Sequence, residues 1–357
     1  MKKRILCGVL ALGLLLGACG CQNTTAQDQP VSTVKTTAEQ TAAKTTVSPY
    51  VMNPLTGVYD LPREKKDQRP VAVMINNLRS SVGAKSAQTV QTGLNQADMV
   101  FETMAEGGIT RLMAVYSDIE KAGQIGTVRS ARYSYAQLAC GLDAVYVHCG
   151  ADNLYATPLM QELGMDRLDL ISSASSAGER VDNGLAYEHT LYTSGEALFQ
   201  YYDGLQTEIK DRAKDIYSFN KKDVTYTKPA LQVNVRFSSN YKSSFTYDAN
   251  TKKYTRGDDG TVLKDYMTGE KEQFKNVLVL YAPVYYMSDN YHVKTVLDSG
   301  KGLYFTNGSC CEIRWEKGNS TAALRFQDAD GNPLSLNAGN SYICLTDTNN
   351  EQYTVIA

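Results

Sequence analysis

Short apolar runs separated by polar turns fill the first half of the chain. Residues 71–75 (Val-Ala-Val-Met-Ile) form a continuous apolar run, which predicts a strand buried on both faces. Residues 144–148 predict another strand, and residues from about 129 to 139 predict a helix that ends near Gly141. Mixed strands and helices of this kind indicate an α/β or α+β domain over residues 50–215.

A β-hairpin is predicted within this first domain. Residues 99–106 and 111–116 both favour strands, and Gly107-Gly108 between them supplies the turn. Glu102 and Glu106 are an even number of residues apart, so on one strand both carboxylates would leave the same face. Arg111 begins the returning strand and would lie close to them.

Helical periodicity disappears beyond about residue 220. Short alternating runs recur between turn signals such as Asp259-Gly260 and Asn307-Gly308. These runs predict a mostly antiparallel β domain over residues 216–357. The string 328–332 (Asp-Ala-Asp-Gly-Asn) is interpreted as a hairpin turn, because its glycine comes too early for a calcium loop and no glutamate closes it.

The N-terminus has the pattern of an export signal. Lys2, Lys3 and Arg4 precede an apolar run over residues 5–16 that is too short to span a bilayer. The run ends in Leu-Gly-Ala-Cys at residues 16–19, which resembles the lipobox of bacterial lipoproteins. This resemblance implies a signal peptide over residues 1–18, acylation of Cys19 (palmitate included), and anchoring to the outer face of the cytoplasmic membrane. The alternative is a simple secretory signal that is cleaved elsewhere.

Residues 19–49 are predicted to be a flexible tether after the lipidated cysteine. Their composition is dominated by Thr, Ala, Gln and Ser, and no aromatic residue occurs over 22–49. Such a segment cannot bury enough apolar surface to offset its chain entropy. The folded part would therefore stand clear of the membrane surface.

Charge and composition exclude several classes of function. The chain has 36 basic and 38 acidic residues, so it carries no excess positive charge for nucleic acid. Its three histidines, His148, His189 and His292, have no metal-ligand spacing. No nucleophile elbow, Walker loop or metal-binding string occurs, and no metal or cofactor is predicted.

The strongest candidate for a binding site is the segment 126–132 (Gly-Thr-Val-Arg-Ser-Ala-Arg). It predicts a loop that enters a helix, with Arg129, Ser130 and Arg132 near the helix start. Backbone N–H groups and arginine side chains in such a place favour phosphate or carboxylate. The alternative is a structural ion network in which Arg129 and Arg132 pair with Glu102 and Glu106.

Three further polar residues lie at the ends of predicted elements. Asn76 follows the strand at 71–75, His148 ends the strand at 144–148, and His189 lies in a loop. Each histidine by itself is more often a hydrogen-bonding residue than a catalyst. Cys149 is not predicted to be a nucleophile paired with His148, because neighbours on a strand point to opposite faces.

Several strings of the folded part resemble the YerB-like lipoproteins. They are residues 69–77 (Arg-Pro-Val-Ala-Val-Met-Ile-Asn-Asn), 96–102, 106–111 (Glu-Gly-Gly-Ile-Thr-Arg), 125–132, 254–256, 276–277, 300–302, 307–308, 315–317 and 330–331. The similarity covers nearly everything after the tether. It implies a lipid-anchored envelope protein of Gram-positive type with a two-part extracytoplasmic domain, and it supplies no reaction. Thr127 stands where the family usually has proline, and Tyr-Glu-His-Thr at 187–190 replaces the usual Ala-Pro-His-Asn.

Two classes of function follow from these observations. The first is an envelope lipoprotein that binds an anionic or glycan ligand of the envelope, or a partner protein. Its predicted binding residues are Asn76, Glu102, Glu106, Arg111, Arg129, Ser130, Arg132, His148 and His189. The second is a hydrolase or transferase acting on wall polymer, with Glu102 or Glu106 as acid or base and His148 assisting. The sequence favours the first, because no motif of a named enzyme class is present.

Overall fold

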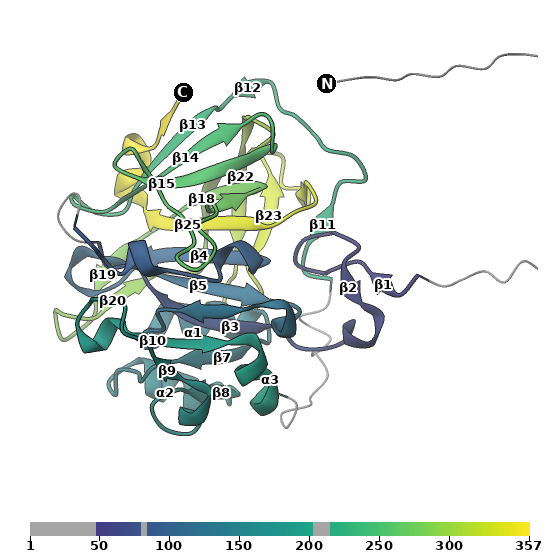
Figure 1. Cartoon of the computed structure of the whole chain (residues 1–357). Coiled ribbons are helices and arrows are strands. Elements are labelled where there is room, and N and C mark those ends of the chain that lie inside the picture. Colours follow the sequence, from purple (N-terminus) through teal and green to yellow (C-terminus); the bar gives the residue numbers. More distant parts are fainter. Residues whose placement is uncertain (1–47, 80–83, 203–214) are drawn as a thin grey trace, which may run out of the picture. The chain divides into compact units, whose positions relative to one another are not determined.

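The computed structural model describes residues 48–79, 84–202 and 215–357 (Figure 1). Residues Ser48–Ala357 form one compact unit. The predicted signal peptide, Cys19 and nearly all of the predicted tether lie outside the described residues. In the part of the chain that is described, no helix is both long and apolar enough to cross a membrane.

An eleven-stranded sheet organises the compact unit. Its order is β12-β22-β21-β18-β25-β4-β5-β3-β7-β8, and β23 pairs with β22. In chain order the strands are β3 (Val71–Asn76), β4 (Met99–Met104), β5 (Thr110–Tyr116), β7 (Val145–His148), β8 (Arg167–Asp169), β12 (Lys228–Pro229), β18 (Asn276–Ala282), β21 (Ser299–Thr306), β22 (Ser309–Glu316), β23 (Arg325–Asp328) and β25 (Ser341–Asp347).

This sheet joins the two parts of the chain. Strand β25, near the C-terminus, lies parallel beside β4, with Ser341 opposite Met99 and Leu345 opposite Thr103. The first part is α+β and the second is β-rich, as predicted. The predicted boundary near residue 215 adjoins residues 203–214, which are not described, and it remains a prediction.

One face of the large sheet is covered by helix α1 (Tyr133–Gly141). Tyr135, Leu138 and Ala139 of this helix pack with Met74 and Tyr146 of the sheet in one apolar cluster. Helix α2 (Ala156–Glu162) lies close to α1.

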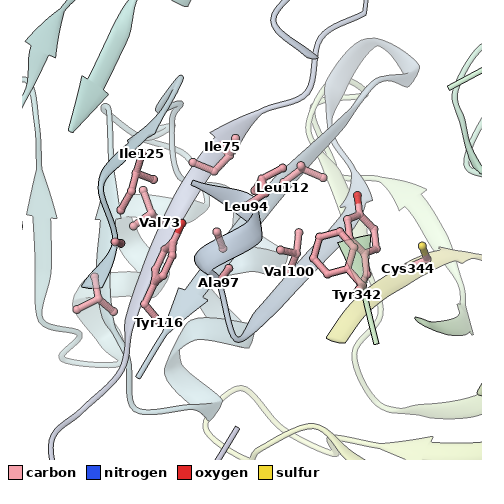
Figure 2. Packing of buried hydrophobic residues seen from close by; sticks show 14 of the residues in the cluster. Val73, Ile75, Leu94, Ala97, Val100, Leu112, Tyr116, Ile125, Tyr342 and Cys344 are labelled. Atoms are coloured by element: carbon pink, nitrogen blue, oxygen red, sulfur yellow. The ribbon is translucent and has the colours of Figure 1, made fainter. Parts of the chain in front are cut away.

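The opposite face is covered by a six-stranded sheet and by smaller elements. Val233, Val235 and Phe245 of the six-stranded sheet belong to the same cluster as Val100 and Tyr342 of the large sheet. Figure 2 shows residues of that cluster, with Ile125 and Val73 on one side of the view and Tyr342 and Cys344 on the other. The six strands are β13 (Gln232–Arg236), β14 (Lys242–Asp248), β15 (Lys253–Asp258), β16 (Thr261–Val262), β17 (Gln273–Phe274) and β26 (Val355–Ile356).

The remaining elements are short. Strands β6 (Gln124–Gly126), β10 (Leu191–Ser194) and β9 (Glu179–Arg180) form a three-stranded sheet, and helix α3 (Gly195–Tyr202) follows β10. Three two-stranded pairs are β1 (Tyr50–Val51) with β2 (Leu61–Pro62), β11 (Ser218–Phe219) with β24 (Ser335–Leu336), and β19 (Val284–Tyr286) with β20 (Val293–Thr295). Short 3₁₀ turns are η1 (Arg63–Lys65), η2 (Gln88–Val90), η3 (Leu94–Gln96), η4 (Glu106–Gly108), η5 (Ile119–Lys121), η6 (Ser175–Ala177), η7 (Tyr187–His189) and η10 (Thr348–Tyr353).

Most local predictions are confirmed. The run 71–75 is strand β3 and is buried throughout, and β4 and β5 form the predicted antiparallel hairpin. Residues 144–148 contain β7, and no α-helix occurs in the described residues 215–357. The string 328–332 is a turn, in which the Asp328 carboxylate accepts from the N–H groups of Asp330 and Asn332.

Two local predictions are wrong. The helix starts at Tyr133 and not near residue 129, because the backbone of the preceding segment bonds to its neighbours: Arg129 donates to Met74, and Ala131 donates to Gly150. Glu106 does not share a strand face with Glu102, since β4 ends at Met104 and Glu106 lies in the 3₁₀ turn η4.

Candidate functional site

Three parallel strands end side by side at one edge of the large sheet. Strands β3, β7 and β8 run in the same direction, so Asn76, His148 and Asp169 at their ends face one edge. Strand β5 is antiparallel to β3 and starts at this edge, where Arg111 lies opposite Asn76. In open α/β sheets this edge is the common place for a ligand.

The extended segment before α1 brings Arg129, Ser130 and Arg132 to the same edge. Its backbone is held between two strand ends, since Arg129 N–H donates to Met74 and Cys149 N–H donates to the Arg129 carbonyl. Arg111 Nη1 donates to the Ser130 carbonyl oxygen at 2.7 Å. Arg111 is therefore in direct contact with the segment 126–132.

Arg132 forms the shortest ion pair at this sheet edge, with Glu106. Its Nε lies 2.7 Å from both carboxylate oxygens of Glu106. Arg111 Nη2 lies farther from Glu106, at 3.9 Å. The structural ion network considered from the sequence thus exists for Arg132 and Glu106, and it does not extend to Arg129 or Glu102.

Arg129 has no carboxylate partner within 4.0 Å among the described residues. Its Nη1 donates instead to the backbone carbonyl of Glu188 at 2.8 Å. Burial, together with the positive charges of Arg132 and Arg180, lowers the pKa of Arg129. Burial also lowers the pKa of Arg111, to about 9, with the charge of Arg132 as the next cause.

The cluster carries more positive than negative charge. The charges of Arg132 and Arg129 act on Arg111, and those of Arg132 and Arg180 act on Arg129. The opposing carboxylates are Glu106 for Arg111 and Glu188 for Arg129. Glu106 is engaged by Arg132, and Glu188 is exposed. An anion placed here would relieve the repulsion among the guanidinium groups. We call these four arginines the arginine cluster.

His189 adds an uncharged donor at the rim of the arginine cluster. Asn76 Nδ2 donates to His189 Nδ1 at 2.8 Å, and the Asn76 side-chain oxygen accepts from Leu78 N–H. These contacts assign the ring proton to Nε2. Burial and the charge of Arg129 lower the pKa of His189, so the ring is neutral at pH 7 and can donate from Nε2.

His148 and Cys149 lie on opposite faces of the strand end, as predicted. Tyr146, two residues before His148, packs in the cluster with α1, while Cys149 packs against the other cluster. Burial lowers the pKa of His148 and raises the pKa of Cys149. The pair therefore has neither the geometry nor the charge state of a nucleophile and its base.

Glu102 lies apart from the arginine cluster. Its side chain is buried and accepts hydrogen bonds from four groups: Asn77 Nδ2 (3.0 Å), Thr110 Oγ1 (2.7 Å), Ser243 Oγ (2.8 Å) and the Tyr342 hydroxyl (2.7 Å). The two last donors come from the second part of the chain. Glu102 therefore belongs to a buried polar network that joins the two parts.

Arg256 extends this buried network. Its guanidinium group, with no exposed surface, pairs with Glu272 at 2.7 Å and donates to the Asn77 side-chain oxygen at 2.8 Å. The strings that contain Asn77, Glu102 and Arg256 thus carry structural contacts between the two parts.

Sequence reasoning missed Arg180 and Arg167. Arg180 reaches the arginine cluster through β9, and Arg167 lies on β8 beside Tyr146. Neither residue lies in or next to a recognisable motif. Their positions depend on the pairing of short strands, which the neighbouring residues do not predict.

Comparison with known proteins identifies the class of this chain. Two family models match it: "Protein of unknown function (DUF3048) N-terminal domain" over residues 55–209, and "Protein of unknown function (DUF3048) C-terminal domain" over residues 233–343. The chain belongs to this two-domain family.

One relative, matched both by its sequence and by its crystal structure, makes the assignment more specific. The Bacillus subtilis (strain 168) protein named "Putative lipoprotein YerB" is 28% identical over 275 residues, which cover 74% of this chain and 78% of the relative. The crystal structure of YerB protein from Bacillus subtilis superimposes with a TM-score of 0.72 and 26% identity, covering 86% of this chain and 99% of that chain. The resemblance to the YerB-like lipoproteins is confirmed.

Proposed function

We propose that this chain is a lipoprotein anchored at Cys19 to the outer face of the cytoplasmic membrane, and that its arginine cluster binds an anionic polymer of the cell envelope. The anchor is supported by the Leu-Gly-Ala-Cys string and by the name of the Bacillus subtilis relative. An extracytoplasmic position brings the folded unit within reach of wall polymers.

The observation that carries the binding proposal is the unbalanced charge of Arg129. A half-buried guanidinium group with a backbone carbonyl as its partner, next to other arginines, is a poor structural contact in the unliganded protein. Phosphate or carboxylate groups of a polymer would provide the missing counter-charges and accept bidentate hydrogen bonds. His189 Nε2 and Ser130 would add neutral contacts at the rim.

A wall hydrolase or transferase receives less support. Glu102 is enclosed by four donors, and Glu106 is bound by Arg132, so neither carboxylate is available as a free acid or base in this arrangement. A glycan or a partner protein with acidic groups could bind the same arginine cluster through the same contacts.

The test uses the unit from Ser48 to Ala357 with purified teichoic acid and muropeptides as probes. Arg129→Ala should lower the affinity for teichoic acid roughly fivefold or more, while the melting temperature stays close to that of the wild type. Arg314→Ala is the matched control, because this substitution also removes one positive charge and Arg314 is exposed on β22. Equal binding by the wild type and Arg129→Ala would contradict the proposal.

The same incubation separates binding from turnover. Retention of the probe with an unchanged mass supports a binding protein. A new product that disappears with Glu106→Gln would instead establish the enzyme.

A further inference from the structure

A hollow lies next to His148, at the ends of β7 and β8. It has a volume of about 610 Å³ and is lined by residues of β7, α2 and β8 and their connections. Its polar lining includes His148, Asn153, Thr157, Arg167, Asp169 and Ser173. Arg129, Arg132 and His189 are not part of this lining.

His148 lines the hollow and has a buried hydrogen-bond acceptor without a partner among the described residues. The side chain is 3% exposed, and its Nδ1 lies 3.0 Å from the Gly150 carbonyl oxygen. Because a carbonyl only accepts, Nδ1 carries the proton and Nε2 carries a lone pair. Nε2 is buried and has no hydrogen-bond partner among the described residues.

Arg167 also lines the hollow and has a buried donor without a partner among the described residues. It lies opposite Tyr146 in the parallel pairing of β7 and β8, two residues from Asp169, which lies opposite His148. Its Nη1 is buried and also has no hydrogen-bond partner in the described part of the chain. Leaving such groups without partners destabilises the folded protein, and a charged group does so more than a neutral one.

Asp169 does not neutralise Arg167 by an ion pair within 4.0 Å in the described structure. Its Oδ1 accepts instead from the N–H groups of Gly150 (2.9 Å) and Ile171 (3.2 Å). The positive charge of Arg167 disfavours a metal ion at His148. A ligand that satisfies both Arg167 Nη1 and His148 Nε2 therefore needs one anionic group and one hydroxyl donor.

We propose that this hollow binds a small hydroxylated anion. Because His148 Nε2 and Arg167 Nη1 are buried, the side chains that line the hollow shift on binding, so that the phosphate or carboxylate group reaches Arg167 and the hydroxyl group donates to His148 Nε2. Ser172, Ser173, Asn153 and Thr157 would contact further hydroxyl groups. The hollow has the size of a small-molecule site. This inference is independent of the proposed function, because it uses other residues and another ligand.

Titration calorimetry on the unit from Ser48 with four probes tests the inference. Glycerol 3-phosphate and lactate carry an anionic group and a hydroxyl, while methyl phosphate and acetate carry the anion alone. At least one hydroxylated probe should bind, and glycerol 3-phosphate should bind roughly tenfold more tightly than methyl phosphate if the ligand is a phosphate. Tighter binding of lactate than of acetate would identify a carboxylate ligand instead.

Variants assign the two contacts. Arg167→Gln should weaken binding of the hydroxylated probe roughly tenfold or more. His148→Phe should remove the preference for the hydroxylated probe, and His148→Gln, which keeps an acceptor near the Nε2 position, should retain part of it. Arg314→Gln on exposed β22 is the control for loss of charge.

A wild-type measurement covers the case in which a variant does not fold. In a ¹⁵N spectrum of the histidine side chains, the unprotonated Nε2 signal of His148 should shift when the hydroxylated probe is added. No binding of either hydroxylated probe, binding that Arg167→Gln leaves unchanged, or an unmoved His148 signal would each overturn the inference. Binding of teichoic acid with no effect of these probes would overturn it while leaving the proposed function in place.

Discussion

Arg132 donates its Nε–H group to both carboxylate oxygens of Glu106, each at 2.7 Å, across the gap between the β4–β5 turn and the start of α1. This contact neutralises one guanidinium group of the arginine cluster. Arg129 receives no equivalent contact among the described residues. The arrangement thus combines a fixed ion pair with charge that remains available for a ligand.

Glu106→Gln should act on stability and on binding in opposite directions. The amide keeps one acceptor for Arg132 and loses the charge, so the free energy of unfolding should fall by about 1–3 kcal/mol. Removing a negative charge from the arginine cluster should raise its affinity for teichoic acid. Urea unfolding and calorimetry measure the two effects, and Glu312→Gln on exposed β22 is the control. Weaker binding by Glu106→Gln would show that Glu106 itself contacts the ligand.

Glu102 should behave as a structural residue. Glu102→Ala leaves four buried donors without their acceptor and should lower the free energy of unfolding by about 3–5 kcal/mol. Ser243→Ala removes only one of these donors and should cost about 1 kcal/mol. Chemical denaturation of the two variants tests this difference. A Glu102→Ala variant as stable as the wild type would contradict the buried network.

His148 should make stability depend on pH. Burial lowers its pKa in the folded state below the unfolded value of about 6.5, so the unfolded chain binds the proton more readily. Stability from this group is complete above about pH 6.5 and is lost as the pH falls through the folded pKa.

His148→Gln provides the measurement. The difference in unfolding free energy between the wild type and His148→Gln should change between about pH 7 and about pH 5, with the wild type losing more. His189 also has a lowered pKa and is present in both proteins, so its contribution cancels in the difference. An equal loss in the two proteins would show that His148 does not titrate in this range.

The sequence predicts the local elements of this fold well. Strand β3 and the turn at Gly107-Gly108 each depend on a few consecutive residues. Hydrophobic periodicity and turn-forming residues are therefore sufficient to predict them. The pairing of β25 with β4 is not predicted, because many apolar strands could pair and their separation along the chain is large.

The candidate site is predicted only in part, because local patterns do not identify contacts between distant segments. Arg111, Arg129, Arg132 and Glu106 do meet, since short turns and loops bring them to one sheet edge. The alternating period predicts one face for Glu102 and Glu106 only if the strand continues beyond Met104, where β4 ends. The partners of Glu102, Ser243 and Tyr342, come from distant segments that period and spacing cannot identify.

The arginine cluster can be tested most directly by observing its guanidinium groups during binding. In a ¹H–¹⁵N spectrum of arginine Nε–H groups, recorded on the unit from Ser48, teichoic acid should shift the signals of Arg129 and Arg111. The signal of the control residue Arg314 should stay in place. Shifts at Arg314 with unmoved Arg129 and Arg111 signals, or no shift at saturating polymer, would contradict anion binding by this cluster.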